Sequence, residues 1–106
     1  MEEVNFMNFE SKVAGGFVLI DFWADWCESC KIQKQFLHNI EDKYKSNLKM
    51  ISLNVGENKY LSQKLSVRNI PALLLFNSGE QIARLDNLQS QELIELFINK
   101  YIKDEK

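Results

Sequence analysis

The feature that most constrains the fold of this chain is an apolar run followed at once by an amphipathic helical pattern. Residues 17–23 are β-branched, aliphatic or aromatic except for one aspartate, and they follow a pair of glycines. Such a run is typical of a strand buried on both faces, so we expect it at the centre of a sheet. Over residues 28–45, apolar side chains recur at three- to four-residue spacing between Lys, Gln and Glu, which predicts a helix of several turns.

The remaining patterns predict an α/β fold. We expect a first helix over residues 4–13 after a cap at Asn5, a strand over 48–55, a short helix capped by Asn58, strands over 72–76 and 81–85, and a last helix after Ser90. The strand–helix–strand order implies parallel pairing with a right-handed crossover. The turn at 77–80 predicts an antiparallel hairpin. The result is a central mixed β-sheet, a parallel βαβ unit followed by an antiparallel hairpin, with helices on both faces.

The last predicted helix also has an apolar stripe. It consists of Leu93, Leu96, Phe97 and Tyr101, which recur at helical spacing. Glu92 lies near the expected N-terminal end, where a negative charge is favourable. We expect this stripe to pack against the sheet.

The composition fits one domain and argues against two classes of partner. The chain has 106 residues, 45% of them hydrophobic, so we place a single domain at residues 1–106. The 13 basic and 15 acidic side chains give a net charge of -2 without a basic stripe, so we expect no nucleic-acid partner. No apolar stretch approaches the roughly 20 residues that cross a bilayer, so we expect no membrane partner. We expect a monomer.

The N-terminal sequence MEEVNFMNFE contains neither a basic n-region nor a continuous apolar segment, so it does not resemble a secretory signal. We therefore expect the cytoplasm, where thiols are kept reduced. A chain of 106 residues can bury a hydrophobic core large enough to stabilise the fold without a disulfide or a structural metal. A close cysteine pair is then more plausibly catalytic or metal-binding than structural.

The two cysteines, Cys27 and Cys30, lie where the predicted central strand leads into the long helix. Unpaired N–H groups and the helix dipole give this end a positive potential, which stabilises a thiolate at Cys27 and favours it as a nucleophile. Cys30 follows one turn later, close enough to resolve a mixed disulfide. The placement indicates a pair that cycles between dithiol and disulfide.

Two other interpretations of the pair stay open. It could be half of a zinc site, because this spacing is common in zinc-binding domains. The single histidine, His38, lies on the same predicted helix, roughly 12 Å along its axis from Cys30, and there is no further cysteine. We expect no metal site and a surface position for His38. The pair could also be chemically inert.

The stretch FVLIDFWADWCESCK, residues 17–31, closely resembles the active-site region of the thioredoxin family. The resemblance continues through Ile70–Pro71 before a strand, the turn at Gly79 and the last helix, and so covers nearly the whole chain. It implies the thioredoxin fold and a protein-disulfide reductase that uses a reversible Cys27–Cys30 disulfide in cell redox homeostasis. It also implies disulfide-containing protein substrates and no bound cofactor. NADPH would act only indirectly, through a thioredoxin reductase that recharges the pair.

The resemblance assigns further roles. Asp21 interrupts the apolar strand, and burial should raise its pKa. In the family the matching aspartate is the general acid/base for the resolving cysteine, here Cys30. Pro71 matches the cis-proline beside the disulfide, and the backbone of Ile70 matches the edge that pairs with an extended substrate. Trp26 matches a tryptophan of the docking surface.

Several residues depart from the family pattern. Glu28 and Ser29 replace Gly-Pro between the cysteines. The Glu28 carboxylate should oppose ionisation of Cys27, although the same negative charge interacts favourably with the positive end of the helix dipole. Ser52 replaces a lysine common near the buried aspartate, so the pKa of Asp21 is expected to rise further. Asp86 and Asn87 replace an apolar residue and a glycine of the substrate groove, which should favour basic or polar partners.

Two other functions stay open, and the departures motivate the first of them. The first is a thioredoxin-fold interaction module, or a reductase devoted to one partner, with weak general reductase activity. The second is a disulfide-forming oxidant, which needs an oxidising compartment that the N-terminal sequence does not support.

Overall fold

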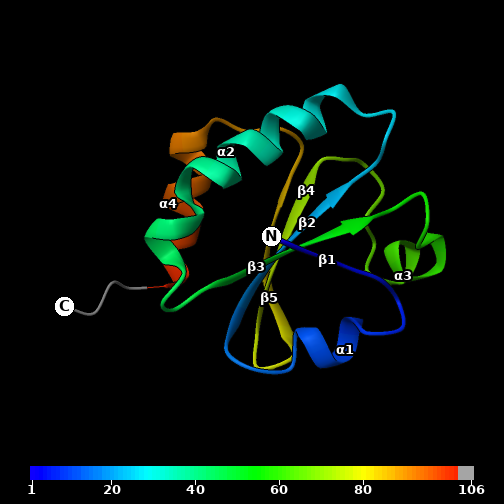
Figure 1. The fold of residues 1–106 in the computed structure, drawn as a ribbon, viewed down its shortest axis with the longest axis horizontal. Helices are drawn as coiled ribbons and strands as arrows, with labels where there is room; N and C mark the ends of the chain where they lie inside the picture. The colour runs from blue at the N-terminus through cyan, green and yellow to red at the C-terminus, as the bar shows by residue number, and fades with distance from the viewer. Residues whose placement is uncertain (103–106) are drawn as a thin grey trace.

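The computed structural model describes residues 1–102, in which five strands form one mixed sheet between two layers of helices (Figure 1). The domain predicted from the sequence extends to residue 106, and its last four residues, 103–106, lie outside the described part. The elements in chain order are β1 (Glu2–Val4), α1 (Phe9–Lys12), β2 (Phe17–Trp23), α2 (Glu28–Tyr44), β3 (Lys49–Asn54), α3 (Lys59–Lys64), β4 (Ala72–Asn77), β5 (Glu80–Asp86) and α4 (Gln91–Tyr101).

The strand order is β1-β3-β2-β4-β5, with β2 at the centre. β3 pairs in parallel with both β1 and β2, whereas β4 is antiparallel to β2 and to β5. The predicted parallel βαβ unit and antiparallel hairpin are therefore confirmed. In this register Asp21 lies between Ser52 of β3 and Leu73 of β4, so the carboxylate belongs to the middle of the sheet.

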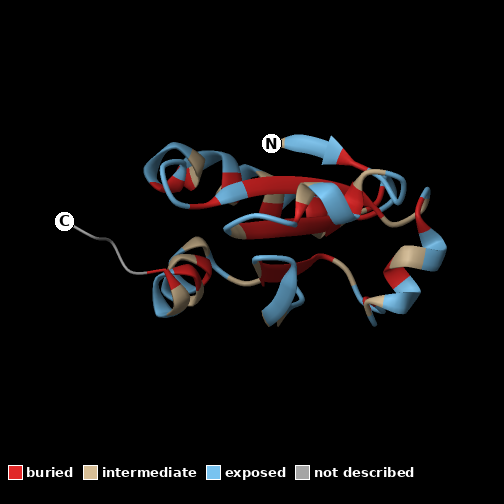
Figure 2. Ribbon diagram, turned by 90° about the horizontal axis from the view of Figure 1, so that it is seen from below, coloured by how far each residue is buried: buried red, intermediate tan, exposed pale blue. Residues whose placement is uncertain are grey.

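Alternation along β2 separates two hydrophobic cores. Val18, Ile20 and Phe22 belong to the core that α1 and α3 cover, and Leu19 belongs to the core under α2 and α4. Figure 2 shows the buried residues concentrated in the central strands, with the exposed residues on the outer faces of the helices. Asp21 points to the same side as Leu19, toward α2.

The predicted first helix is wrong over most of residues 4–13. Residues 2–4 form strand β1 on the edge of β3, and only Phe9–Lys12 is helical. The Asn5 side chain accepts hydrogen bonds from the N–H groups of Met7 and Asn8, and the Asn8 side chain accepts one from Asn5 N. These local bonds compete with the helix and form a turn in its place.

Of the three predicted caps, those of α3 and α4 have different outcomes. The Ser90 hydroxyl accepts a hydrogen bond from Leu93 N at 3.1 Å, which confirms the cap of α4. Asn58 occupies the N-cap position of α3, but its side chain makes no cap bond. It accepts from Phe6 N and donates to the Asn54 carbonyl, both at 2.9 Å. Asn58 therefore ties the chain after β1 to the end of β3.

The predicted apolar stripe of α4 is partly wrong. The fully buried residues are Ile94 and Ile98, whereas Leu93 and Leu96 are exposed. Phe97 and Tyr101 are half-buried beside them and pack edge to face at the margin of the core. The helix is therefore rotated from the predicted face, with Ile94 and Ile98 packed into the core that α2 and the sheet share. Within residues 1–102, none of the helices has the length and apolarity needed to cross a membrane.

Candidate active site

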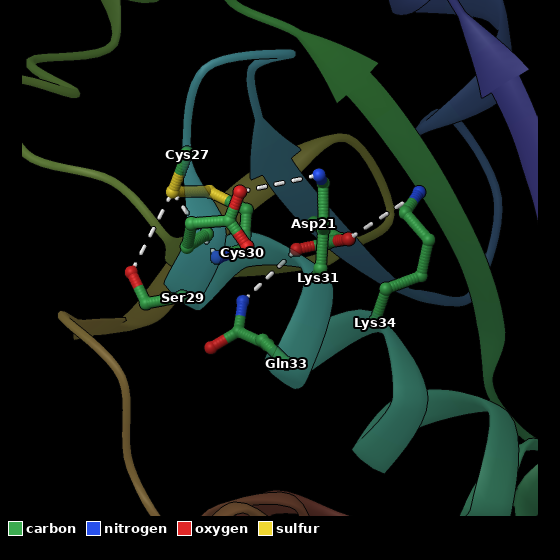
Figure 3. The surroundings of a disulfide bond; sticks show 8 residues. Asp21, Cys27, Ser29, Cys30, Lys31, Gln33 and Lys34 are labelled. Atoms are coloured by element: carbon green, nitrogen blue, oxygen red, sulfur yellow. Dashed lines mark hydrogen bonds and ion pairs between the residues drawn. A yellow bond between two sulfur atoms is a disulfide. The ribbon is translucent and has the colours of Figure 1, made fainter.

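Cys27 and Cys30 form a disulfide at the start of α2, with their Cα atoms 5.3 Å apart (Figure 3). Cys27 is the N-cap residue, and its Sγ accepts a hydrogen bond from Cys30 N at 3.1 Å. The Ser29 hydroxyl lies 3.6 Å from the same sulfur. Cys27 is 9% exposed and Cys30 is 1% exposed. The outer sulfur thus faces donor groups that would stabilise a thiolate, while the inner sulfur lies beneath the surface.

The Glu28 carboxylate is directed to a lysine of the next turn. Glu28 Oε2 lies 3.3 Å from Lys31 Nζ, and both side chains are largely exposed. Solvent screening and the lysine charge weaken the effect of this carboxylate on Cys27. Ser29, in contrast, places its hydroxyl against the sulfur. The two residues between the cysteines therefore act in opposite directions on a negative charge at Cys27, and Ser29 contacts the sulfur directly.

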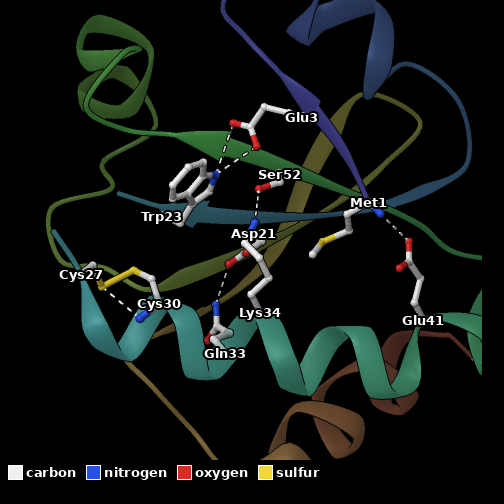
Figure 4. Close-up of polar contacts among 10 residues, drawn as sticks. All are labelled: Met1, Glu3, Asp21, Trp23, Cys27, Cys30, Gln33, Lys34, Glu41 and Ser52. Atoms are coloured by element: carbon white, nitrogen blue, oxygen red, sulfur yellow. Dashed lines mark hydrogen bonds and ion pairs between the residues drawn. A yellow bond between two sulfur atoms is a disulfide. The ribbon is translucent and has the colours of Figure 1, made fainter. Parts of the chain in front are cut away.

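Asp21 is fully buried between the sheet and α2. Its Oδ1 accepts a hydrogen bond from Gln33 Nε2 at 2.9 Å, and its Oδ2 lies 3.8 Å from Lys34 Nζ (Figure 4). Among the described residues, Oδ2 has no hydrogen-bond partner. Burial raises the pKa of the Asp21 carboxyl to about 6, against the lowering effects of the Gln33 hydrogen bond and the Lys34 charge. The expected rise is confirmed, and desolvation is its main cause.

Lys34 supplies a cation that sequence reasoning did not place near Asp21. Its Nζ donates a hydrogen bond to Ser52 Oγ at 3.1 Å and lies 4.8 Å from the centroid of the Trp23 ring. The Trp23 indole N–H in turn donates to the Glu3 carboxylate at 3.1 Å (Figure 4). Ser52 lacks the positive charge of a lysine, but Lys34 of α2 supplies a cation to Asp21 from the helix instead.

Ile70 and Trp26 surround the disulfide. Ile70 packs against the small buried cluster that contains both cysteines. The Ile70–Pro71 peptide bond is cis, as the resemblance implies. Trp26 is 70% exposed, and its ring lies over Gly56, where an added Cβ would meet it at 3.1 Å. Because Gly56 has no side chain, it leaves room for the Trp26 ring at the surface next to Cys27.

Asp86 and Asn87 lie at the end of β5, beside the proline. Asn87 N donates to the Pro71 carbonyl at 2.9 Å, and its φ of 67° is in the left-handed region, which asparagine tolerates better than most residues. Asp86 Oδ1 accepts from Arg84 at 3.0 Å. This ion pair offsets the negative charge that sequence reasoning assigned to the groove. Asp86, Asn87 and Arg84 line a shallow polar hollow together with Arg68.

Sequence reasoning missed three residues of this site: Gln33, Lys34 and Glu3. Gln33 had a detectable signal, because it continues the buried spacing of Cys30, Leu37 and Ile40 along α2 and is polar where its neighbours are apolar. Lys34 and Glu3 had no such signal, since their side chains reach the site from half-exposed and exposed positions. His38 is exposed, as expected. Residues 1–102 bring together no group of three or more His, Cys, Asp or Glu suited to a metal ion.

Comparison with known proteins gives one consistent family. The family model described as "Thioredoxin" matches residues 1–100. A thioredoxin of Buchnera aphidicola subsp. Baizongia pistaciae (strain Bp) is 39% identical over 94 residues, which cover 89% of this chain and 84% of that protein. A thioredoxin of Chlamydia pneumoniae is 34% identical over 94 residues, covering 89% of this chain and 91% of that protein. A solved structure of a mutant thioredoxin from Halobacterium salinarum NRC-1 has a TM-score of 0.86 at 25% identity, covering 99% of this chain and 93% of the other.

Proposed function

The chain belongs to the thioredoxin family, and on this basis we propose a mechanism for its active site. It is a thiol-disulfide oxidoreductase of the thioredoxin type, and Cys27–Cys30 is its redox-active disulfide. The roles of the individual residues are our proposal. The observation that carries it is the difference between the two sulfurs: the Cys27 sulfur accepts a hydrogen bond from Cys30 N at the helix end and Cys27 keeps 9% of its surface exposed, whereas Cys30 is only 1% exposed.

In the first step, the Cys27 thiolate attacks one sulfur of a substrate disulfide. A bond forms between Cys27 Sγ and that sulfur, the substrate S–S bond breaks, and the other substrate sulfur leaves as a thiolate. The Cys30 N–H, the Ser29 hydroxyl and the N-terminus of α2 stabilise negative charge on Cys27 before the attack. Glu28 opposes that charge only weakly, because Lys31 pairs with it at the surface.

In the second step, Cys30 resolves the mixed disulfide. The Cys30 thiol gives its proton to the Asp21 carboxylate, and the resulting thiolate attacks Cys27 Sγ. The Cys27–Cys30 bond forms, and the second substrate sulfur leaves as a thiolate that takes up a proton. The substrate gains two electrons and the cysteine pair loses two. Gln33, one turn after Cys30 on α2, donates to Asp21, which supports the placement of the acid/base on the side of Cys30.

We place the substrate on the surface around Cys27, with Trp26 beside the nucleophile. The backbone of Ile70, before cis Pro71, would pair with an extended segment of the substrate. Asp86 and Asn87 would border that segment, and the Arg84–Asp86 ion pair makes this border polar without a net negative charge. We propose polar substrate segments rather than basic ones on this evidence.

The family implies disulfide-containing proteins as substrates and a reductase that returns the electrons. We propose that this reductase is a thioredoxin reductase that draws on NADPH and that the chain works in the cytoplasm. An interaction module with incidental redox activity is not favoured, because the cysteine pair is intact and positioned for exchange.

The test uses insulin as a generic protein disulfide, together with NADPH and a thioredoxin reductase, and follows the loss of NADPH. We expect the wild-type protein to accelerate the reaction and the Cys27→Ser variant to return it to the rate without protein. A matched Cys30→Ser variant should keep the nucleophile and accumulate a mixed disulfide with insulin, visible by mass spectrometry. Equal rates for wild type and Cys27→Ser would refute the proposed roles.

A further inference from the structure

The buried carboxylate of Asp21 faces a restricted set of groups. Helix α2 contributes the neutral amide of Gln33 and the ammonium of Lys34, and Ser52 of β3 and Leu73 of β4 flank it in the sheet. Glu3 of β1 acts on it from farther away and raises its pKa. The cysteine pair lies at the start of the same helix. Of the charged groups in this set, Lys34 is the one whose charge favours an ionised Asp21.

Lys34 is fixed in place by three elements. Its ammonium donates to Ser52 on β3 and lies over the Trp23 ring at the end of β2, and Glu3 on β1 holds the indole N–H of that tryptophan. The side chain is about one-third exposed, at 32%, so it links the solvent to a carboxylate that is itself buried. A lysine held by a hydrogen bond and an aromatic face has little freedom to leave Asp21.

Lys34 also borders the resolving cysteine. A cavity of about 390 Å³ is lined by Trp23, Ala24, Asp25, Cys30, Lys31 and Lys34. Its wall therefore includes both the residue that must lose a proton and the cation next to the proposed acceptor.

We infer that Lys34 is a positioning residue for the reaction: it keeps Asp21 in the carboxylate form that takes the proton of Cys30. Ser52, which faces Asp21 from β3, has no charge and cannot stabilise the carboxylate in this way. This inference rests on the proposed function. Lys34 touches neither the substrate nor the sulfur in the proposed cycle and acts through Asp21. The hydrogen bond, the aromatic contact and the cavity carry the inference independently of any titration.

The decisive variant is Lys34→Met, which removes the charge and keeps most of the alkyl stem that lines the cavity. An opposite charge 4–6 Å away typically moves a carboxyl pKa by about one unit or more. We expect the titration midpoint of the Asp21 side-chain carbon, measured by NMR, to rise by about one pH unit. At that shift the ionised fraction falls about twofold at pH 7 and about fivefold at pH 6, and the rate of mixed-disulfide resolution should fall with it.

Two further variants separate charge from structure. Lys34→Arg keeps the charge and should keep the wild-type midpoint. Lys45→Met removes one charge from the C-terminal end of the same helix and should leave both midpoint and rate unchanged. Rates with insulin are expressed as a ratio to wild type at each pH from 5.5 to 8, which cancels the pH dependence of the reagents. A merely structural lysine would change this ratio equally at every pH.

An unchanged midpoint in Lys34→Met, an equal shift in Lys34→Arg, or a rate ratio that does not vary with pH would each overturn the inference. Failure of the proposed function looks different. In that case the wild-type protein itself shows no Cys27-dependent reduction of insulin, whatever the titration of Asp21.

Discussion

The two ends of helix α2 each join a lysine to a carboxylate, but the two clusters differ in burial. At the C-terminal end, Glu95 of α4 accepts from Lys43 at 2.6 Å and from the Tyr44 hydroxyl at 3.0 Å, close to the surface. The hydrogen bond from Lys43 lowers the pKa of Glu95. At the N-terminal end, burial raises the pKa of Asp21 to about 6 although a lysine is near.

The difference lies in how completely each carboxylate is satisfied. Glu95 has two donors on one oxygen and solvent nearby, so it is stable as an anion and connects α2 to α4. Asp21 has one hydrogen bond, and its second oxygen lacks a partner among the described residues. A buried, partly satisfied carboxylate lowers stability when it is ionised. Such an arrangement is expected where proton transfer is the task, and the C-terminal cluster has the features of a structural contact.

The largest effect on this comparison is expected from Asp21→Asn. The amide keeps the size of the side chain and can still accept from Gln33, but it cannot take a proton. We expect mixed-disulfide resolution at pH 7 to slow by about 10-fold or more, as for loss of a general base. The attack by Cys27 should be unaffected. Rapid-mixing measurements that resolve the two steps provide the check.

The matched control is Glu95→Gln, the same change at the other end of the helix. We expect it to leave both steps at the wild-type rate. If Glu95→Gln slowed resolution as much as Asp21→Asn does, the two clusters would not differ in function.

Asp21→Asn also reveals a pH dependence of stability. The pKa of Asp21 is raised on folding, so the protonated carboxyl stabilises the folded state. This contribution is complete below the unfolded pKa near 4 and is lost as the pH rises through about 6. A shift of about two units corresponds to about 3 kcal/mol. Between pH 4 and pH 8, the unfolding free energy of the oxidised wild type should therefore fall by about 2.5 kcal/mol relative to Asp21→Asn, since a small part of the change lies below pH 4.

Urea unfolding of both proteins across this pH range gives the measurement. A constant difference between the two proteins would mean that Asp21 has the same pKa folded and unfolded. Burial would then not be the source of its functional role.

Asp21 and the two cysteines were predictable from the sequence because they interrupt strong patterns. Asp21 stands inside an apolar strand, and the cysteines stand at a strand–helix junction. The same periodicity located β2 and α2 within a residue or two. Residues that reach the site from outside these patterns were not predictable. Lys34 is one of several lysines on α2, and only the three-dimensional register of β2, β3 and α2 brings it to Asp21.

Short and local elements were also missed, for a different reason. Strand β1 has three residues, and its pairing with β3 depends on an edge that the sequence of β1 does not encode. The side chains of Asn5 and Asn8 then form a turn where apolar spacing favoured a helix. At the groove, the sequence showed a negative charge at Asp86 but not its ion pair with Arg84, two residues away on the same strand.

The smallest effect is expected from Tyr44→Phe at the C-terminal end of α2. The change removes a hydroxyl that bonds to Glu95 at 3.0 Å and to Asn99 at 3.1 Å, while the ring stays in the core. Loss of these partly exposed bonds should lower the unfolding free energy by about 1 kcal/mol. Tyr60→Phe is the control, because Tyr60 is largely exposed and should not change stability. Neither variant should alter the resolution rate or the titration of Asp21, and a slower resolution step in Tyr44→Phe would show that the two ends of α2 are coupled.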